Sequence, residues 1–224
     1  MIIKTGIVRH FGELIKRAEE NIITKINDGR LQTEPSVTER LLQEIEDVFE
    51  SYGTVQGIRF RAPTLRDRGP NAPERTFGAD FCGVLDIDLP EFKQLKGFLA
   101  QAKSESRGIS IRNPSSVKKE VYSPANNEFR RLKEQAARML EITPDSFAII
   151  YSVRGFVVVP ASSIQGLRRG DAPLYGKPLD SFFKEFIMCF IGDPELSAYD
   201  DQTLERLRER TKSRAAIMFQ IREQ

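Results

Sequence analysis

Several sequence features that are typical of particular classes of protein are scarce or missing in this chain. Only two cysteines occur, Cys82 and Cys189, and both lie within apolar runs. This pattern favours small buried hydrophobic residues in a reducing compartment over a disulfide framework. No stretch approaches the roughly 18 uncharged apolar residues of a membrane span, and the first residues lack the continuous apolar segment of a secretory leader. We therefore expect a cytoplasmic protein without a membrane partner.

Histidine occurs once, as His10. Serine or cysteine triads that depend on histidine, and zinc sites built from several histidines, are therefore excluded. A P-loop string and a GxGxxG string are also missing, which argues against nucleotide-driven motors and dinucleotide enzymes. The 34 Lys and Arg residues almost balance the 32 Asp and Glu residues. The net charge of +2 does not by itself indicate a polyanionic partner.

The length of 224 residues favours one elaborated domain over two independent ones. Apolar periodicity predicts helices at 9–27, 37–52, 127–140 and 181–190, and a charged helix from about residue 202 to the end. Alternating or short apolar runs predict strands at 54–62, 77–87, 96–103, 147–151 and 156–159. The segment 63–75 holds three prolines and a glycine among charges and is expected to be an exposed loop.

The two strands after the middle helix are too apolar to tolerate an exposed face. We therefore expect an α/β fold with a mixed central sheet flanked by helices. The helix at 9–27 carries an apolar stripe of Phe11, Leu14, Ala18 and Ile22. This stripe should be buried either on the core or on a second copy of the chain, and the second alternative would make the protein a homo-oligomer.

Polar residues stand at the ends of two neighbouring strands in the middle of the chain. Asp80 heads the strand at 77–87, and Gln101-Ala102-Lys103 ends the next one. Gln101 and Lys103 are two residues apart, so their side chains share one face of a strand. Antiparallel pairing across a hairpin would bring Asp80 beside that face. An acid, an amide oxygen and a lysine would then converge, as hydrolysis of a phosphodiester with a hard divalent cation requires.

This constellation resembles the D...(D/E/Q)xK signature of the PD-(D/E)XK, or restriction-endonuclease-like, nuclease superfamily. That superfamily has an αβββαβ core, and the elements expected between 37 and 151, about half of the chain, follow that order. In its Mrr-like branch a glutamine replaces the acid of the lysine tripeptide, as Gln101 does here. Two features depart from the pattern: Ala79 stands where a proline is usual, and the 21 residues from Asp80 to Gln101 are a long separation.

The resemblance implies a deoxyribonuclease that depends on Mg²⁺ or Mn²⁺. Asp80 and the carbonyl of Ala102 would bind the cation, Gln101 would assist, and Lys103 would orient the attacking water. The Mrr-like branch also has a glutamate on the first core helix, followed by apolar residues at +3, +6 and +10. Glu39 fits this spacing, so it would be a further metal and catalytic residue, with Glu44 and Glu46 as alternatives on the same helix.

The implied substrate is DNA in preference to RNA, and the implied role is restriction or antiphage defence, alone or with a defence-system partner. Residues 31–164 would form the nuclease core, 1–30 an N-terminal helical extension, and 165–224 a helical part packed on the same domain. Basic residues flank the candidate site in sequence, as contacts to phosphates would require. Those assigned to nucleic-acid binding are Arg59, Arg61, Arg107, Arg112, Lys118 and Lys119.

Less specific interpretations stand beside these assignments. Asp86 and Asp88 could bind a metal, but a solvated hairpin tip explains them as well. Gln135 could reach the site through its amide, although an exposed helical glutamine is the simpler interpretation. The alternative function is a catalytically inactive protein of nuclease fold that binds nucleic acid or regulates a larger complex.

Overall fold

The structure is a computed structural model that describes residues 4–31, 33–55, 57–66, 79–105, 127–167 and 174–224. A mixed sheet of nine strands forms its centre, in the order β1-β2-β9-β4-β5-β6-β7-β8, with β3 also paired to β9. The strands are β1 (Thr54–Val55), β2 (Ile58–Arg61), β3 (Thr64–Arg66), β4 (Phe81–Leu89), β5 (Phe92–Ser104), β6 (Ser146–Ser152), β7 (Gly155–Pro160), β8 (Lys177–Pro178) and β9 (Ala215–Glu223).

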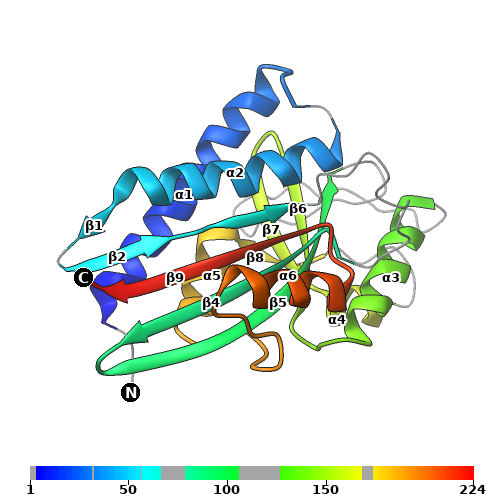
Figure 1. Ribbon diagram of the computed structural model, residues 1–224. Helices are drawn as coiled ribbons and strands as arrows, with labels where there is room; N and C mark the ends of the chain where they lie inside the picture. The colour runs from blue at the N-terminus through cyan, green and yellow to red at the C-terminus, as the bar shows by residue number, and fades with distance from the viewer. Residues whose placement is uncertain (1–3, 32, 56, 67–78, 106–126, 168–173) are drawn as a thin grey trace.

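Six helices of the described ranges cover the two faces of this sheet. They are α1 (Thr5–Asn27), α2 (Glu34–Tyr52), α3 (Asn127–Leu140), α4 (Ala161–Gly166), α5 (Leu179–Ile187) and α6 (Asp201–Thr211). The apolar residues of α1, α2 and α5 pack on one face, and those of α3, α4 and α6 pack on the other. Figure 1 shows α1 and α2 above the sheet, α6 in front of it, and β9, in red, between β2 and β4. The expected α/β class with a mixed, helix-flanked sheet is confirmed.

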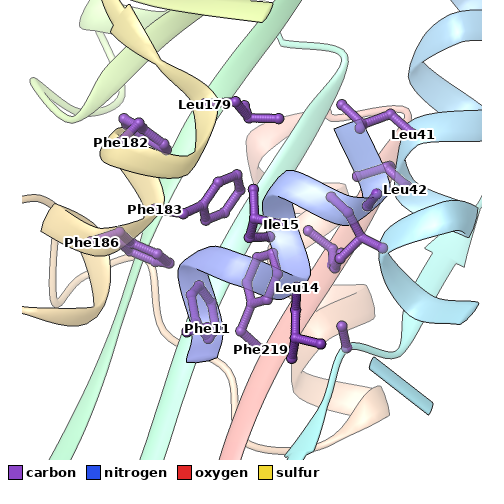
Figure 2. Packing of buried hydrophobic residues seen from close by; sticks show 14 of the residues in the cluster. Phe11, Leu14, Ile15, Leu41, Leu42, Leu179, Phe182, Phe183, Phe186 and Phe219 are labelled. Carbon is purple, nitrogen blue, oxygen red and sulfur yellow. The ribbon is translucent and has the colours of Figure 1, made fainter. Parts of the chain in front are cut away.

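Aromatic side chains fill the layer between the sheet and the helices α1, α2 and α5. The ring of Phe98 lies edge-on to that of Phe186, with centroids 4.9 Å apart, and Phe183 meets Phe219 in the same manner at 5.1 Å. Figure 2 shows these helices meeting around Phe11, Phe183 and Phe219. Rings in edge-to-face contact add to the stability that their buried area already provides.

The apolar stripe of α1 is buried inside the chain. Phe11, Ala18 and Ile22 have no exposed surface, and Leu14 is 2% exposed. They pack in the cluster that includes α2, α5 and the sheet. The stripe is therefore buried on the core, the first of the two expected alternatives, and gives no support for association with a second copy.

The C-terminal part differs most from the expectation. A helix was expected from about residue 202 to the end, but α6 ends at Thr211 and the chain then forms β9. This strand pairs antiparallel with β2 and β3 and parallel with β4. Its residues from Ala215 to Phe219 are all buried, because helices cover both faces of the sheet at this point. Residues 165–224 are therefore not a helical addition, since they contribute a central strand.

Smaller differences affect other segments. The strand expected at 54–62 is a hairpin of β1 and β2, joined at Gly57, whose φ of 76° suits glycine. The segment expected to be a loop at 63–75 forms the strand β3 over its first residues, and its part from 67 onward lies outside the described residues. Cys82 is buried as expected, whereas Cys189 is exposed, with a φ of 66°. None of the helices in the described ranges is long and apolar enough to cross a membrane.

Candidate active site

Asp80 and Gln101 face each other at one end of the β4–β5 hairpin. The two strands pair antiparallel with Phe81 opposite Ala100, and Asp80 immediately precedes this pair. The Nε2 of Gln101 donates a hydrogen bond to Asp80 Oδ2 at 2.5 Å, and the backbone N–H of Ala102 donates to the same oxygen at 3.0 Å. The predicted juxtaposition of Asp80 with Gln101 and Ala102 is confirmed.

The side chains of Gln101 and Lys103 lie on the face of the sheet covered by α3, α4 and α6. Along β5, Ala100 and Ala102 belong to the cluster on the α1 side, whereas Leu99 belongs to the cluster on the α3 side. Because side chains alternate along a strand, Gln101 and Lys103 share the face of Leu99. Gln101 is 3% exposed and Lys103 is half-buried at the end of the strand.

One oxygen at this site is buried without a hydrogen bond. Gln101 Nε2 donates to Asp80 Oδ2 and, at 3.1 Å, to the carbonyl oxygen of Ala102. Both of these atoms are acceptors, so they fix the orientation of the amide group. Gln101 Oε1 is then left buried and without a partner in the described part of the chain. A buried oxygen in this state costs free energy unless a donor or a cation meets it.

Arg214 is the residue at this site that the sequence did not reveal. It immediately precedes β9, whose Ala215 pairs with Phe81 of β4, and its Nε lies 4.0 Å from Asp80 Oδ1. The two residues are far apart in the sequence, and only the pairing of β4 with β9 brings them together. Because the end of the chain was expected to be helical, nothing in the sequence pattern placed Arg214 near Asp80.

The described contacts do not link the glutamates of α2 to Asp80. Glu39 is exposed, on a helix that packs against the opposite face of the sheet from Gln101 and Lys103. Glu44 is buried against α1, where it pairs with Lys25 and accepts a hydrogen bond from Asn21 at 2.8 Å. These contacts give Glu44 a role in joining α1 to α2.

Glu46, the third glutamate considered on α2, holds that helix to β3. Its Oε2 accepts from the Thr64 hydroxyl at 2.6 Å. Within the described residues, no group of three or more His, Cys, Asp or Glu side chains is arranged to hold a metal ion. A cation at Asp80 would therefore have fewer than three such side chains of the described residues as ligands, and amide or carbonyl oxygens and water would complete its shell.

The basic residues assigned to nucleic-acid binding do not gather at the site. Arg61 pairs with Gln220, and Gln220 pairs with Asp86, which lies six residues from Asp80 along β4. At about 3.3 Å per residue this places Arg61 roughly 20 Å from Asp80, and Arg59 lies further away along β2. The two arginines flank the site in sequence but not in space. Arg107, Arg112, Lys118 and Lys119 lie outside the described residues.

The other candidate residues have mixed outcomes. Asp88 is exposed and pairs with Lys93 at 2.8 Å, as expected of a hairpin tip. Asp86 is not solvated, since it is 6% exposed and pairs with Arg222 of β9. Gln135 is not an exposed glutamine either, because it is half-buried on α3 and its Oε1 is buried without a partner among the described residues.

The thiol nearest to this part of β4 is not suited to nucleophilic chemistry. Burial raises the pKa of Cys82 to about 12, although the hydroxyls of Thr211 and Ser213 partly offset this effect. A neutral thiol at physiological pH is a poor nucleophile and a poor metal ligand. Cys82 therefore acts as a core residue beneath the turn that leads into β9.

A hollow of about 270 Å³ lies near the end of β5, on the other side of the sheet. Ile26 and Tyr151, which contribute to it, pack with the cluster on the α1 side. It is therefore separate from the face that carries Gln101 and Lys103. Its lining residues are Ile26, Leu31, Ser104, Glu105, Tyr151, Ser152 and Val153.

The described geometry thus joins Asp80, Gln101 and Ala102 by hydrogen bonds and brings Arg214 Nε within 4.0 Å of Asp80, with Lys103 on the same face of β5 as Gln101. Comparison with protein-family models, with curated proteins and with solved structures finds no match to this chain.

Proposed function

We propose that this protein is a divalent-cation-dependent phosphodiester hydrolase that cleaves nucleic acid at the site formed by Asp80, Gln101 and Lys103. The observation that carries this proposal is the arrangement of oxygens at the β4–β5 hairpin. A carboxylate is oriented by two hydrogen bonds, and the amide oxygen of Gln101, buried without a partner, adjoins it. An oriented carboxylate beside an unsatisfied neutral oxygen is a donor set suited to a hard cation such as Mg²⁺ or Mn²⁺.

The residues fit such a cation with a small number of protein ligands. Mg²⁺ keeps several waters and is commonly bound through one or two carboxylates together with the phosphates of its substrate. Asp80, Gln101 Oε1 and the carbonyl of Ala102 would hold it here. When bound, the cation neutralises charge on the phosphoryl oxygens and acts as a Lewis acid toward the attacking water.

The chain's own residues have separable roles in this reaction. Gln101 Nε2 fixes the direction of the Asp80 carboxylate, so Asp80 is preorganised for binding. Lys103 lies on the same face of β5 as Gln101, where its ammonium orients the attacking water and stabilises negative charge developing on the phosphoryl group. Water then adds to phosphorus, the bond to the leaving sugar oxygen breaks, and that oxygen takes up a proton.

The substrate class is supported by charge next to the site. Two exposed basic residues, Lys212 and Arg214, follow the end of α6, and Arg214 Nε lies 4.0 Å from Asp80 Oδ1. A cation beside the reacting centre favours a substrate that carries phosphates. DNA as the preferred nucleic acid and a role in restriction or antiphage defence, with or without a partner protein, rest on the resemblance of the motif alone.

One observation favours a second candidate, a nuclease-like protein that binds nucleic acid without cleaving it. The hydrogen bonds described at the site involve one carboxylate, Asp80, and no group of three acidic or other metal-ligating side chains is found among the described residues. A site with this composition could retain a cation weakly and bind phosphates without hydrolysis. The two candidates differ in whether strand breaks appear when a divalent cation is added.

The test is cleavage of plasmid DNA, single-stranded DNA and RNA by the purified full chain with Mg²⁺, Mn²⁺ or EDTA. We expect breaks that require the cation and that disappear in the Asp80→Asn variant, which retains one acceptor oxygen for Gln101 Nε2 and the Ala102 N–H but loses the charge. The matched control is Asp88→Asn, which removes an exposed carboxylate at the other end of the same strand. Undiminished cleavage by Asp80→Asn would exclude this site, and binding without cleavage by the wild type would favour the second candidate.

A further inference from the structure

Arg214 is held beside the candidate site by the backbone of two neighbouring strands. Ala215 pairs with Phe81, and the N–H of Ala215 donates a hydrogen bond at 3.1 Å to the carbonyl oxygen of Asp80. Residues 80 and 214 are therefore in register across a parallel pair. The position of the Arg214 backbone relative to Asp80 follows from the sheet and does not depend on a surface loop.

The turn before Arg214 is tied down from both sides. The Ser213 N–H donates to the carbonyl of Arg208 at 3.0 Å, and the Thr211 and Ser213 hydroxyls are hydrogen-bonded to each other at 2.9 Å. The buried Arg208 guanidinium donates to the carbonyl of Ser213 at 3.3 Å. The Arg214 side chain is 56% exposed beyond this turn, so a flexible cation extends from a fixed base.

The two oxygens of Asp80 have different surroundings. Oδ2 accepts the hydrogen bonds from Gln101 Nε2 and the Ala102 N–H, whereas Oδ1 is the oxygen nearest to the Arg214 guanidinium. The 4.0 Å from Arg214 Nε to Oδ1 is too long for a hydrogen bond. The guanidinium is therefore held near Asp80 by charge and remains able to form hydrogen bonds with another anion.

We propose that Arg214 is the phosphate-binding cation of this site, and that it balances the charge of Asp80 until a divalent cation binds to that carboxylate. This inference rests on the function proposed above and adds a residue and an order of events to it. A guanidinium presents parallel N–H donors that match two oxygens of a phosphate. Once the divalent cation neutralises Asp80, Arg214 turns to the phosphodiester beside the reacting bond.

The proposal has two consequences that act in opposite directions. Arg214 competes with the divalent cation for Asp80, so removal of its charge strengthens binding of the cation when no nucleic acid is present. Arg214 contacts the substrate phosphate, so the same change weakens binding of nucleic acid. A surface arginine that merely pairs with Asp80 would produce the first effect without the second, and an arginine with no role at the site would produce neither.

The test compares the wild type with Arg214→Gln and Arg214→Lys, and uses Arg206→Gln, an exposed arginine on α6, as the control. Mn²⁺ binding is measured by calorimetry on the protein alone. Binding of a fluorescent single-stranded DNA is measured with Ca²⁺ in place of Mg²⁺ over a series of salt concentrations. All four proteins are also assayed for cleavage with Mg²⁺.

We expect Arg214→Gln to bind Mn²⁺ about two- to fivefold more tightly. The variant loses the repulsion between the guanidinium and the cation, and this repulsion is modest because both charges lie near a partly solvated surface. Its DNA affinity should fall roughly tenfold, and the dependence on salt should decrease by about one released counterion. Arg214→Lys should keep wild-type Mn²⁺ affinity but regain only part of the DNA affinity, because an ammonium lacks the paired donors of a guanidinium. Arg206→Gln should match the wild type in Mn²⁺ affinity.

Wild-type cleavage combined with unchanged Mn²⁺ and DNA affinities in Arg214→Gln would overturn the role of Arg214 and leave the proposed function standing. Tighter Mn²⁺ binding without weaker DNA binding would reduce Arg214 to a partner of Asp80 and would also overturn the proposal. If the wild type neither binds Mn²⁺ nor cleaves, the proposed function fails, and the role of Arg214 fails with it.

Discussion

The side-chain amide of Gln101 donates a hydrogen bond to Asp80 Oδ2 at 2.5 Å across the start of the β4–β5 hairpin. Through this contact the neutral Gln101 orients the carboxylate of Asp80. The Oε1 atom of Gln101 is itself buried without a partner among the described residues. An acid at position 101 would lose the donor and add a second negative charge beside Asp80. The glutamine therefore favours a folded state that is stable before any cation binds.

This relationship predicts the behaviour of Gln101→Glu. Without a divalent cation the variant places two carboxylates together in a buried position, which should destabilise the fold by about 3 kcal/mol. Mn²⁺ should restore the loss and raise the melting temperature of the variant more than that of the wild type, because the added carboxylate is a stronger ligand than an amide. Thermal unfolding over a range of Mn²⁺ concentrations measures both effects.

The control for this measurement is Gln94→Glu, which adds the same charge to the half-buried other end of β5. It should show little response of its melting temperature to Mn²⁺. If Gln101→Glu is destabilised but Mn²⁺ does not restore it, Gln101 packs beside Asp80 without being a ligand.

Phe219 of β9 should be among the most important residues for stability. It is fully buried and meets the rings of Phe11, Phe49 and Phe183 at centroid distances of 5.4, 5.8 and 5.1 Å. Phe219→Ala removes these contacts and leaves a cavity, so the free energy of unfolding should fall by about 3 to 5 kcal/mol. Urea unfolding followed by circular dichroism gives this value.

The matched control is Phe190→Ala, because Phe190 is 77% exposed. Its free energy of unfolding should stay within about 0.5 kcal/mol of the wild type. A similar small effect for Phe219→Ala would mean that β9 is not part of the stable core.

The strand that carries Phe219 shows where the sequence could not predict the fold. The run from Ala215 to Phe219 follows the charged residues of α6 and is apolar on both sides, because β9 is covered there by helices on both faces of the sheet. Such a run has no period of two, so it cannot be distinguished from the end of a helix by its pattern. Helices with one buried face, such as α1 and α3, have a clear period and were predicted to within a few residues.

The candidate site, like the fold, could be predicted from the sequence only in part. The contact between Asp80 and Gln101 could be predicted because a hairpin joins the two strands, and its register is local in the sequence. The position of Arg214 could not be predicted, since it depends on a parallel pairing between segments far apart in the chain. The prediction for Glu39 relied on spacing alone, and spacing does not tell which face of the sheet the helix covers.

Glu19 of α1 should make the stability depend on pH. Its Oε1 accepts a hydrogen bond at 2.7 Å from the N–H of Phe156, and burial raises the pKa of this carboxyl to about 7, with a further contribution from the negative charge of Asp180. A carboxyl whose pKa is raised in the folded state makes its full contribution to stability when the pH is below its pKa in the unfolded chain, which is 4.5. This contribution is lost as the pH rises from there through about 7.

Chemical unfolding at pH values from 4.5 to 8 measures this dependence for the wild type, Glu19→Gln and, as a control on α2, Glu50→Gln. A glutamine at position 19 keeps an acceptor for Phe156 but cannot ionise, so Glu19→Gln should gain about 2 kcal/mol over the wild type across this interval. This gain is smaller than the full pKa difference between the folded and the unfolded chain would give, because the Glu19 side chain is only half-buried. Glu50 is exposed, so Glu50→Gln should show no such gain. Parallel curves for the wild type and Glu19→Gln would contradict the assignment.

Lys103→Ala should separate catalysis from binding at the candidate site. Under the proposed function the ammonium acts on charge that develops during hydrolysis, whereas other cations hold the substrate backbone. The variant should therefore lose cleavage, by at least about a hundredfold in kcat, and keep most of its affinity for nucleic acid. Single-turnover cleavage and DNA binding with Ca²⁺ measure the two properties on the same preparation.

Two further variants serve as comparisons for Lys103→Ala. Lys93→Ala removes an exposed lysine from the opposite end of the same hairpin and should cleave at the wild-type rate. Lys103→Arg keeps the charge but changes its shape and reach, so it should recover only part of the lost rate. If Lys103→Ala lost DNA affinity in proportion to cleavage, the lysine would be a binding residue, because a group that acts only on the transition state lowers kcat without weakening the ground-state complex.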